Sequence, residues 1–78
     1  MTVAGFKNLL EDILELPPGT IADFDSRETL KTWSSLADVQ ILTAIAGELG
    51  VEPDPALLEA ETVGDMIAIL RERAALSD

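Results

Sequence analysis

Ser34 and Ser35 are the first residues of this chain whose chemistry could serve a function. They follow Trp33 at the junction between a long polar stretch and a segment with helical periodicity. A catalytic serine needs a general base, but the chain contains no histidine, and nothing in the sequence marks Lys31 as a buried partner. Helix capping explains a serine at this corner, and Ser35 with Asp38 has the spacing of a capping box. The local sequence therefore favours a structural role for these hydroxyls.

The acidic residues are the second candidate feature. The chain has 15 acidic and 5 basic residues, which gives a formal net charge of −10. Between residues 32 and 70 all charged side chains are acidic, namely Asp38, Glu48, Glu52, Asp54, Glu59, Glu61 and Asp65. Such a stretch is either a solubilising surface or a face that steers basic partner proteins into short-lived complexes, and the residues alone leave both interpretations open.

Metal binding and catalysis find little support in the sequence. Asp23 and Asp25 begin like an EF-hand loop. However, Arg27 occupies its fifth position, Glu28 replaces the required glycine, and Ser34 replaces the bidentate glutamate. The absence of cysteine removes zinc–thiolate sites, disulfides and thiol nucleophiles, and 78 residues leave little room for a substrate cavity beside a helical core. We expect a protein that is not an enzyme and holds no metal.

Composition and charge define the broad class of protein. A hydrophobic fraction of 47% is ordinary for a folded domain and too high for a disordered acidic tail, so we expect one domain over residues 1–78. The acidic balance argues against binding to nucleic acid or to anionic lipid. No apolar run is long enough for a membrane span, and residues 1–16 lack the pattern of a signal peptide. A monomeric, soluble, cytoplasmic protein is the expectation.

The first half of the chain predicts one helix and a long connection. Residues 2–16 carry apolar side chains at helical spacing, and Pro17 and Pro18 should stop that helix. The connection then runs to about residue 33. An unstructured loop of this length is unusual, so we expect its apolar side chains to pack against the core. These side chains are Ile21, Phe24 and Leu30, and Trp33 is expected to be partly buried in the core as well.

The second half predicts three helices and no strand. One helix should cover residues 35–49 and end at Gly50, where a left-handed cap is expected. Its expected apolar face consists of Leu36, Val39, Leu42, Ile45 and Leu49. A short helix over residues 55–59 should start at an aspartate–proline pair, and a capping box from Thr62 to Asp65 should open the last helix.

Together these pieces resemble the acyl carrier protein family, over essentially the whole chain. The resemblance includes the first helix ending at prolines, the long loop, and Ser35-Leu36 at the start of the second helix. It continues with Gly50-Val51-Glu52-Pro53-Asp54 and with Thr62-Val63-Gly64-Asp65-Met66-Ile67. The interval from Ser35 to Thr62 is 27 residues, as is typical between the attachment serine and the last helix of such carriers.

The resemblance implies both a fold and a function. It implies an all-α, acyl-carrier-like four-helix bundle with one short helix and a long first loop. Ser35 would carry a covalent 4'-phosphopantetheine arm that holds an acyl or related intermediate as a thioester, as in fatty acid or polyketide biosynthesis. Leu36, Asp38 and Glu48 would contact partners. The partners implied are a phosphopantetheinyl transferase and acyl-transferring, ligating and condensing enzymes.

Three positions depart from the family pattern. Ser34 stands where the family usually has aspartate, and Ala37 and Gln40 stand where fatty-acid carriers often have acids. The sequence Trp33-Ser34-Ser35-Leu36-Ala37 is more similar to stand-alone carriers of specialised metabolism. An alternative remains open, in which the chain is an unmodified interaction module with a carrier fold. Serine at position 34 favours this alternative, whereas the intact Ser35-Leu36 pair favours the carrier.

Overall fold

The computed structural model describes residues 1–52 and 54–77. These residues form four helices, namely α1 (Val3–Leu14), α2 (Ser35–Leu49), α3 (Pro55–Glu59) and α4 (Val63–Glu72). The described part contains no strand, only isolated bridges that pair Thr2 with Ser77 and Ser26 with Thr62. The expectation of an all-α fold is thereby confirmed. None of the helices described is long and apolar enough to cross a membrane.

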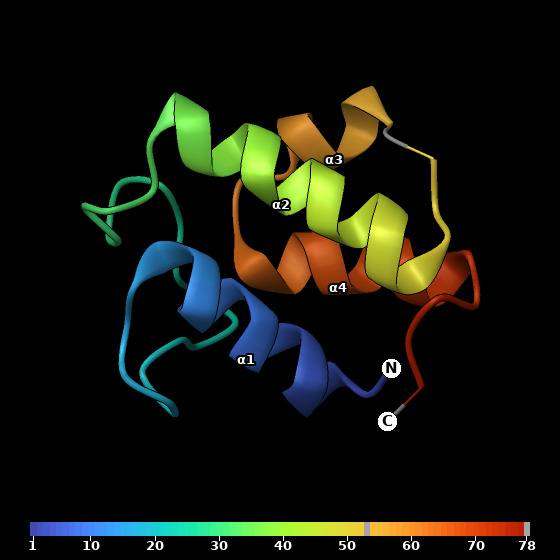
Figure 1. The fold of residues 1–78 in the computed structure, drawn as a ribbon, viewed down its shortest axis with the longest axis horizontal. Helices are drawn as coiled ribbons and strands as arrows, with labels where there is room; N and C mark the ends of the chain where they lie inside the picture. Colours follow the sequence, from blue (N-terminus) through green and yellow to red (C-terminus); the bar gives the residue numbers. More distant parts are fainter. Residues whose placement is uncertain (53, 78) are drawn as a thin grey trace.

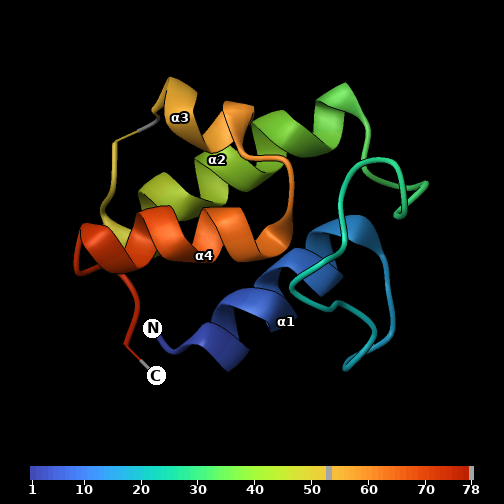
Figure 2. The same ribbon diagram turned by 180° about the vertical axis from the view of Figure 1, so that it is seen from behind.

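The helices pack around one apolar core, with both chain ends on the same side. Figure 1 shows α1 below α4 and α2, with α3 above them, and Figure 2 shows the same order from behind. The long connection between α1 and α2 lies at the end of the molecule opposite the two termini. The core side chains come from all four helices and from this connection; the most fully buried include Phe6, Leu10, Ile45, Leu57 and Leu70.

Helix α1 ends two residues earlier than the sequence predicted, at Leu14 rather than residue 16. Glu15 follows in a left-handed conformation, with φ 58° and ψ 43°. Its N–H donates to the carbonyl oxygen of Asp12, and that of Leu16 donates to the carbonyl oxygen of Glu11 at 2.8 Å. Because Pro17 disfavours helical geometry in the residue before it, the chain leaves the helix before reaching the prolines.

The long connection packs against the core as predicted, except for one of the expected side chains. Ile21, Leu30 and Trp33 are buried, but Phe24 is 76% exposed, so its assignment as a core residue was wrong. The neighbouring Asp25 is buried instead, since its carboxylate accepts hydrogen bonds from the Ala22 N–H (2.8 Å) and the Thr29 hydroxyl (3.0 Å). This turn directs Asp25 inward and leaves the adjacent side chain in solvent.

Helix α2 has the predicted bounds, but only part of its predicted face packs on the core, namely Ile45 with the half-buried Leu42 and Leu49. It ends at Gly50, whose φ of 67° is the expected left-handed cap. Its buried residues are Ala37, Ile41 and Ile45. Leu36 and Val39 were expected in the core and are 67% and 60% exposed. Because this helix is apolar on most of its circumference, hydrophobic periodicity does not by itself select the buried side.

Both remaining helix starts follow the predicted caps. Asp54 accepts a hydrogen bond from the Ala56 N–H at 2.8 Å, and it also pairs with Arg73. The Ala56 bond and then Arg73 lower the pKa of Asp54, so the stabilisation from this cap is present above the ordinary value of 3.8 and is lost as the pH falls through the lowered value. Thr62 and Asp65 form the expected capping box of α4.

The burial pattern of α2 predicts an unequal response to truncation. Ile45 is fully buried, whereas Leu42 only packs against the edge of the core. We expect Ile45→Ala to lower the free energy of unfolding by about 2–5 kcal/mol, and Leu42→Ala by less. Val39→Ala, at an exposed position, is the control and should stay within about 0.5 kcal/mol of wild type. Urea denaturation measures all three, and a loss for Val39→Ala as large as that for Ile45→Ala would contradict the observed face.

Candidate functional site

Ser34 and Ser35 have different environments although they are adjacent. Ser34 is the N-cap of α2; its hydroxyl oxygen accepts a hydrogen bond from the Ala37 N–H (3.3 Å) and its carbonyl oxygen accepts one from the Asp38 N–H (3.0 Å). Ser35 is the first helical residue and is exposed. Its hydroxyl makes no hydrogen bond to any described residue. The capping role thus falls to Ser34, and the Ser35 hydroxyl is accessible.

The start of α2 is suited to an anion on Ser35. With the Ala37 N–H bound by the cap, the N–H groups of Ser35 and Leu36 are left without an acceptor among the described residues. Such groups, together with the dipole of this 15-residue helix, favour negative charge at the helix start. A phosphodiester on the Ser35 oxygen would meet these donors. The residues present therefore fit the phosphate of a phosphopantetheine group.

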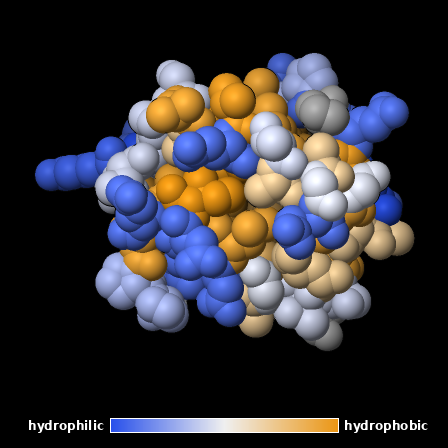
Figure 3. Space-filling view, viewed as in Figure 1, coloured by the Kyte–Doolittle hydropathy of each residue, from blue (hydrophilic) through white to orange (hydrophobic). Residues whose placement is uncertain are grey.

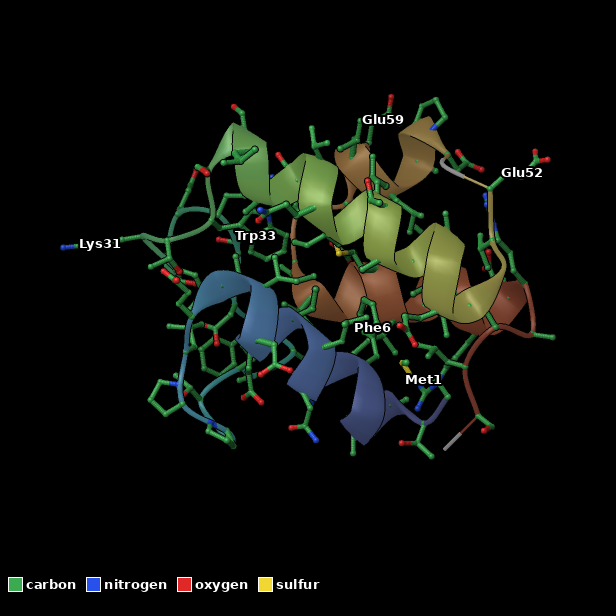
Figure 4. The ribbon with its side chains drawn as sticks, in the orientation of Figure 1. Met1, Phe6, Lys31, Trp33, Glu52 and Glu59 are labelled. Carbon is green, nitrogen blue, oxygen red and sulfur yellow. The ribbon has the colours of Figure 1, made fainter. Side chains whose placement is uncertain are left out.

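Lys31 does not supply a general base to this corner. Figure 4 shows its side chain extending into solvent, away from the body of the molecule, while Trp33 two residues later points inward. No hydrogen bond joins Lys31 to Ser35 in the part of the chain described. The geometry gives no support to a serine–lysine pair.

Asp38 lies in a side-chain network that the sequence did not predict. The Arg27 Nε donates to both of its carboxylate oxygens (3.0 and 3.2 Å), and Nη2 donates to Oδ1 (2.9 Å). The Trp33 Nε1 also donates to Oδ1, at 2.7 Å. The guanidinium of Arg27 lies 5.0 Å from the centroid of the Trp33 ring, within range of a cation–π interaction.

The same guanidinium reaches the end of α3. Arg27 Nη1 donates to the carbonyl oxygen of Ala60 (2.9 Å), and Nη2 donates to that of Leu58 (3.3 Å). We call Arg27, Trp33, Asp38 and these two carbonyl groups the Arg27 cluster. Sequence reasoning considered Arg27 only as a residue that breaks an EF-hand pattern. No local signal identifies its hydrogen-bond partners, because they lie 11 to 33 positions away in the sequence.

The two acidic residues expected to contact partners occupy different settings. The side chain of Asp38 is only 20% exposed, and its charge is compensated by Arg27. Glu48 is exposed near the other end of α2, about 15 Å along the helix at 1.5 Å per residue. The structure does not bring these two carboxylates together. Of these two residues, Glu48 is the one whose carboxylate is exposed to solvent.

The exposed surface of α2 near Ser35 is apolar. Leu36 and Val39 project from it, and Leu58 on the neighbouring α3 is 46% exposed. Figure 3 shows hydrophobic surface interrupting the hydrophilic side chains over this part of the molecule. Leu36, predicted as a partner contact, is therefore accessible.

Two hollows lie near these residues. One of about 310 Å³ lies between Arg27, Glu28 and Glu61. The other, of about 300 Å³, lies between the end of α1 and the start of α2, and we call it the α1–α2 hollow. It is lined by Ile13, Leu14, Glu15, Thr32, Ser34, Leu36, Ala37 and Gln40. The described residues contain no group of three or more acidic side chains that could hold a metal ion.

Comparisons with protein family models, with curated proteins and with solved structures found no match for this chain. Functional inference therefore rests on the residues and geometry of this corner, with the resemblance noted in the sequence.

The Arg27 cluster predicts a stability effect larger than that of an ordinary surface ion pair. Arg27→Met removes every donor that Arg27 contributes to Asp38 and the two carbonyl groups, so we expect a loss of about 1–3 kcal/mol. It should also change the Trp33 fluorescence, because the ring loses its guanidinium neighbour. Lys7→Met, which removes the more exposed Lys7–Asp23 pair, is the control and should lose less than about 1 kcal/mol. Equal losses by urea denaturation, with unchanged Trp33 fluorescence, would show that the cluster is only a surface contact.

Proposed function

We propose that this protein is an acyl carrier protein. Ser35 carries a covalent 4'-phosphopantetheine arm, and the protein passes an acyl or related intermediate, held on that arm as a thioester, between partner enzymes. The observation that carries the proposal is the position of Ser35. This exposed residue is the first of α2, and its hydroxyl lies beside backbone N–H groups that have no acceptor among the described residues. The element order and the long first loop support an acyl-carrier-like bundle as the fold.

The proposal accounts for what the chain lacks. A carrier needs no catalytic group, and the arm supplies the reactive thiol, so a chain with neither histidine nor cysteine meets the requirement. The chain's own contribution is to hold Ser35 at an accessible helix start and to present a contact surface to enzymes. Within the proposal, the protein is a cytoplasmic monomer, and its partners are the transferase and acyl-transferring, ligating and condensing enzymes, with no nucleic acid or membrane.

The site of attachment is tested by two serine variants. Incubation with coenzyme A and a broad-specificity phosphopantetheinyl transferase should raise the intact mass of wild type by one phosphopantetheine group. Ser35→Ala should abolish the increase, and Ser34→Ala should keep it while losing about 1 kcal/mol of stability with the N-cap. Circular dichroism confirms that both variants are folded. Modification of Ser35→Ala but not of Ser34→Ala would overturn the assignment.

Charge reversals test how the transferase recognises α2. Asp38→Lys and Glu48→Lys should slow modification, and the penalties should shrink as salt rises. Asp38→Lys also disrupts the Arg27 cluster, so a part of its penalty should persist at high salt. Asp78→Lys is expected to have no effect, and Asp78 lies outside the described residues. Glu72→Lys, at the end of α4, is a control at a described position.

Equal modification rates for all four variants would contradict electrostatic recognition. The negative charge would then serve solubility, and recognition would have to be sought in apolar contacts such as Leu36.

A second candidate function is an unmodified interaction module. It is favoured by Ser34 in place of the usual aspartate and by the exposed apolar side chains Leu36, Val39 and Leu58. Intact mass separates the two proposals. Wild type that stays unmodified while Ser34→Asp becomes modified would support the module, since the only change restores the family residue at the capping position.

A further inference from the structure

The α1–α2 hollow combines two kinds of lining in one concave surface. Its polar lining includes the residues Thr32, Ser34 and Gln40. Its apolar lining comes from Ile13 and Leu14 on α1 together with Leu36 and Ala37 on α2. At about 300 Å³ it lies at the small end of the range of ligand pockets in proteins.

The charge distribution of the hollow selects a class of ligand. Glu15 is the only ionisable residue in its lining. Hydroxyl and amide groups can exchange hydrogen bonds with a neutral ligand, whereas a carboxylate at the rim opposes the entry of an anion. The lining therefore suits an uncharged ligand that has both polar and apolar parts.

The rim on the α1 side has a conformation fixed by the backbone. Glu15 is not a glycine, yet it adopts a left-handed conformation with φ 58°. The chain around it is held by the hydrogen bonds to the carbonyl oxygens of Glu11 and Asp12. A left-handed residue directly after a helix is a common way for the helix to end, and here it sets the direction in which the chain leaves α1. The α1 side of the hollow therefore follows from the way in which α1 ends.

The position of Ser35 identifies the occupant. Ser34 and Leu36, its neighbours on either side, both line the hollow. A chain attached to the Ser35 oxygen starts beside the rim, so its effective concentration at the hollow is high even if the contacts are weak. The pantetheine part of the arm is uncharged and carries two amide groups separated by methylene groups, which is the class of ligand that the lining selects.

We propose that the α1–α2 hollow is a seat for the uncharged part of the phosphopantetheine arm. This inference rests on the function proposed above. The phosphate stays at the start of α2, where the free N–H groups lie, and the amide-bearing chain runs toward the end of α1. Gln40 and Thr32 exchange hydrogen bonds with its amides, and the apolar lining covers its methylene groups. The arm is thereby held on the α1 side of the bundle and not over α3.

A spin-labelled arm tests the seat directly. The transferase attaches phosphopantetheine bearing a nitroxide at its thiol end to ¹⁵N-labelled protein, and intact mass verifies attachment. Amide signals of Ile13, Glu15 and Gln40 should broaden several-fold more than those of Ala56 and Leu58 on α3. Uniform weak broadening, or broadening centred on α3, would overturn the seat while leaving the carrier function intact. Failure of attachment under these conditions would overturn the carrier function itself, and the seat with it.

A side-chain substitution with a matched control tests the polar contacts. Gln40→Ala should reduce the difference in broadening between α1 and α3 several-fold. It should also raise, several-fold, the rate at which the unlabelled arm's thiol reacts with a small disulfide reagent, because the arm leaves the hollow more often. Asn8→Ala removes the same amide group from an exposed position of α1 that does not line the hollow, and should change neither quantity. Identical results for Gln40→Ala and Asn8→Ala would refute the contact.

Discussion

The Arg27 guanidinium holds together three parts of the chain that lie far apart in the sequence. It joins the long connection to Asp38 in the first turns of α2 and to the carbonyl groups of Leu58 and Ala60 at the end of α3. The last carbonyl groups of a helix lack partners within the helix, so these two are natural acceptors. With only five residues, α3 has little intrinsic stability and depends on such tertiary contacts. Arg27 therefore helps to fix α3 relative to the Ser35 corner, together with the buried Leu57 and the pairing of Asp54 with Arg73.

The same cluster explains the rotation of α2. The contacts of Asp38 with Arg27 and Trp33 and the burial of Ala37 and Ile41 require the same rotation, which leaves Leu36 and Val39 in solvent. Helical periodicity cannot supply this information, since it treats the two apolar sides of the helix as equivalent. Phe24 was misassigned for a related reason, because the inward turn of Asp25 depends on hydrogen bonds to Ala22 and Thr29.

The features that could be predicted from the sequence are those determined by residues close together in the chain. The bounds of α2 and α3 were predicted correctly because their signals, Ser34, Gly50 and the Asp54-Pro55 pair, act within a few residues. The local sequence also placed a capping serine at this corner, but its Ser35–Asp38 spacing pointed to Ser35, whereas the structure shows that Ser34 caps α2 and that Ser35 is exposed. The α1–α2 hollow and the compensation of Asp38 could not be predicted, since each joins α2 to segments whose placement depends on the complete fold.

The division of roles between the two serines has an electrostatic consequence for the corner. An aspartate at position 34 would cap α2 and also place a negative charge against the positive end of its dipole. Ser34 provides the cap without the charge, and the only acid in the first turn, Asp38, is compensated by Arg27. The described residues therefore place no uncompensated side-chain anion in the first turn of α2. A phosphate on Ser35 would meet a helix start whose positive potential is not opposed by a side chain of the first turn, so serine at position 34 favours the group that the proposed function attaches to Ser35.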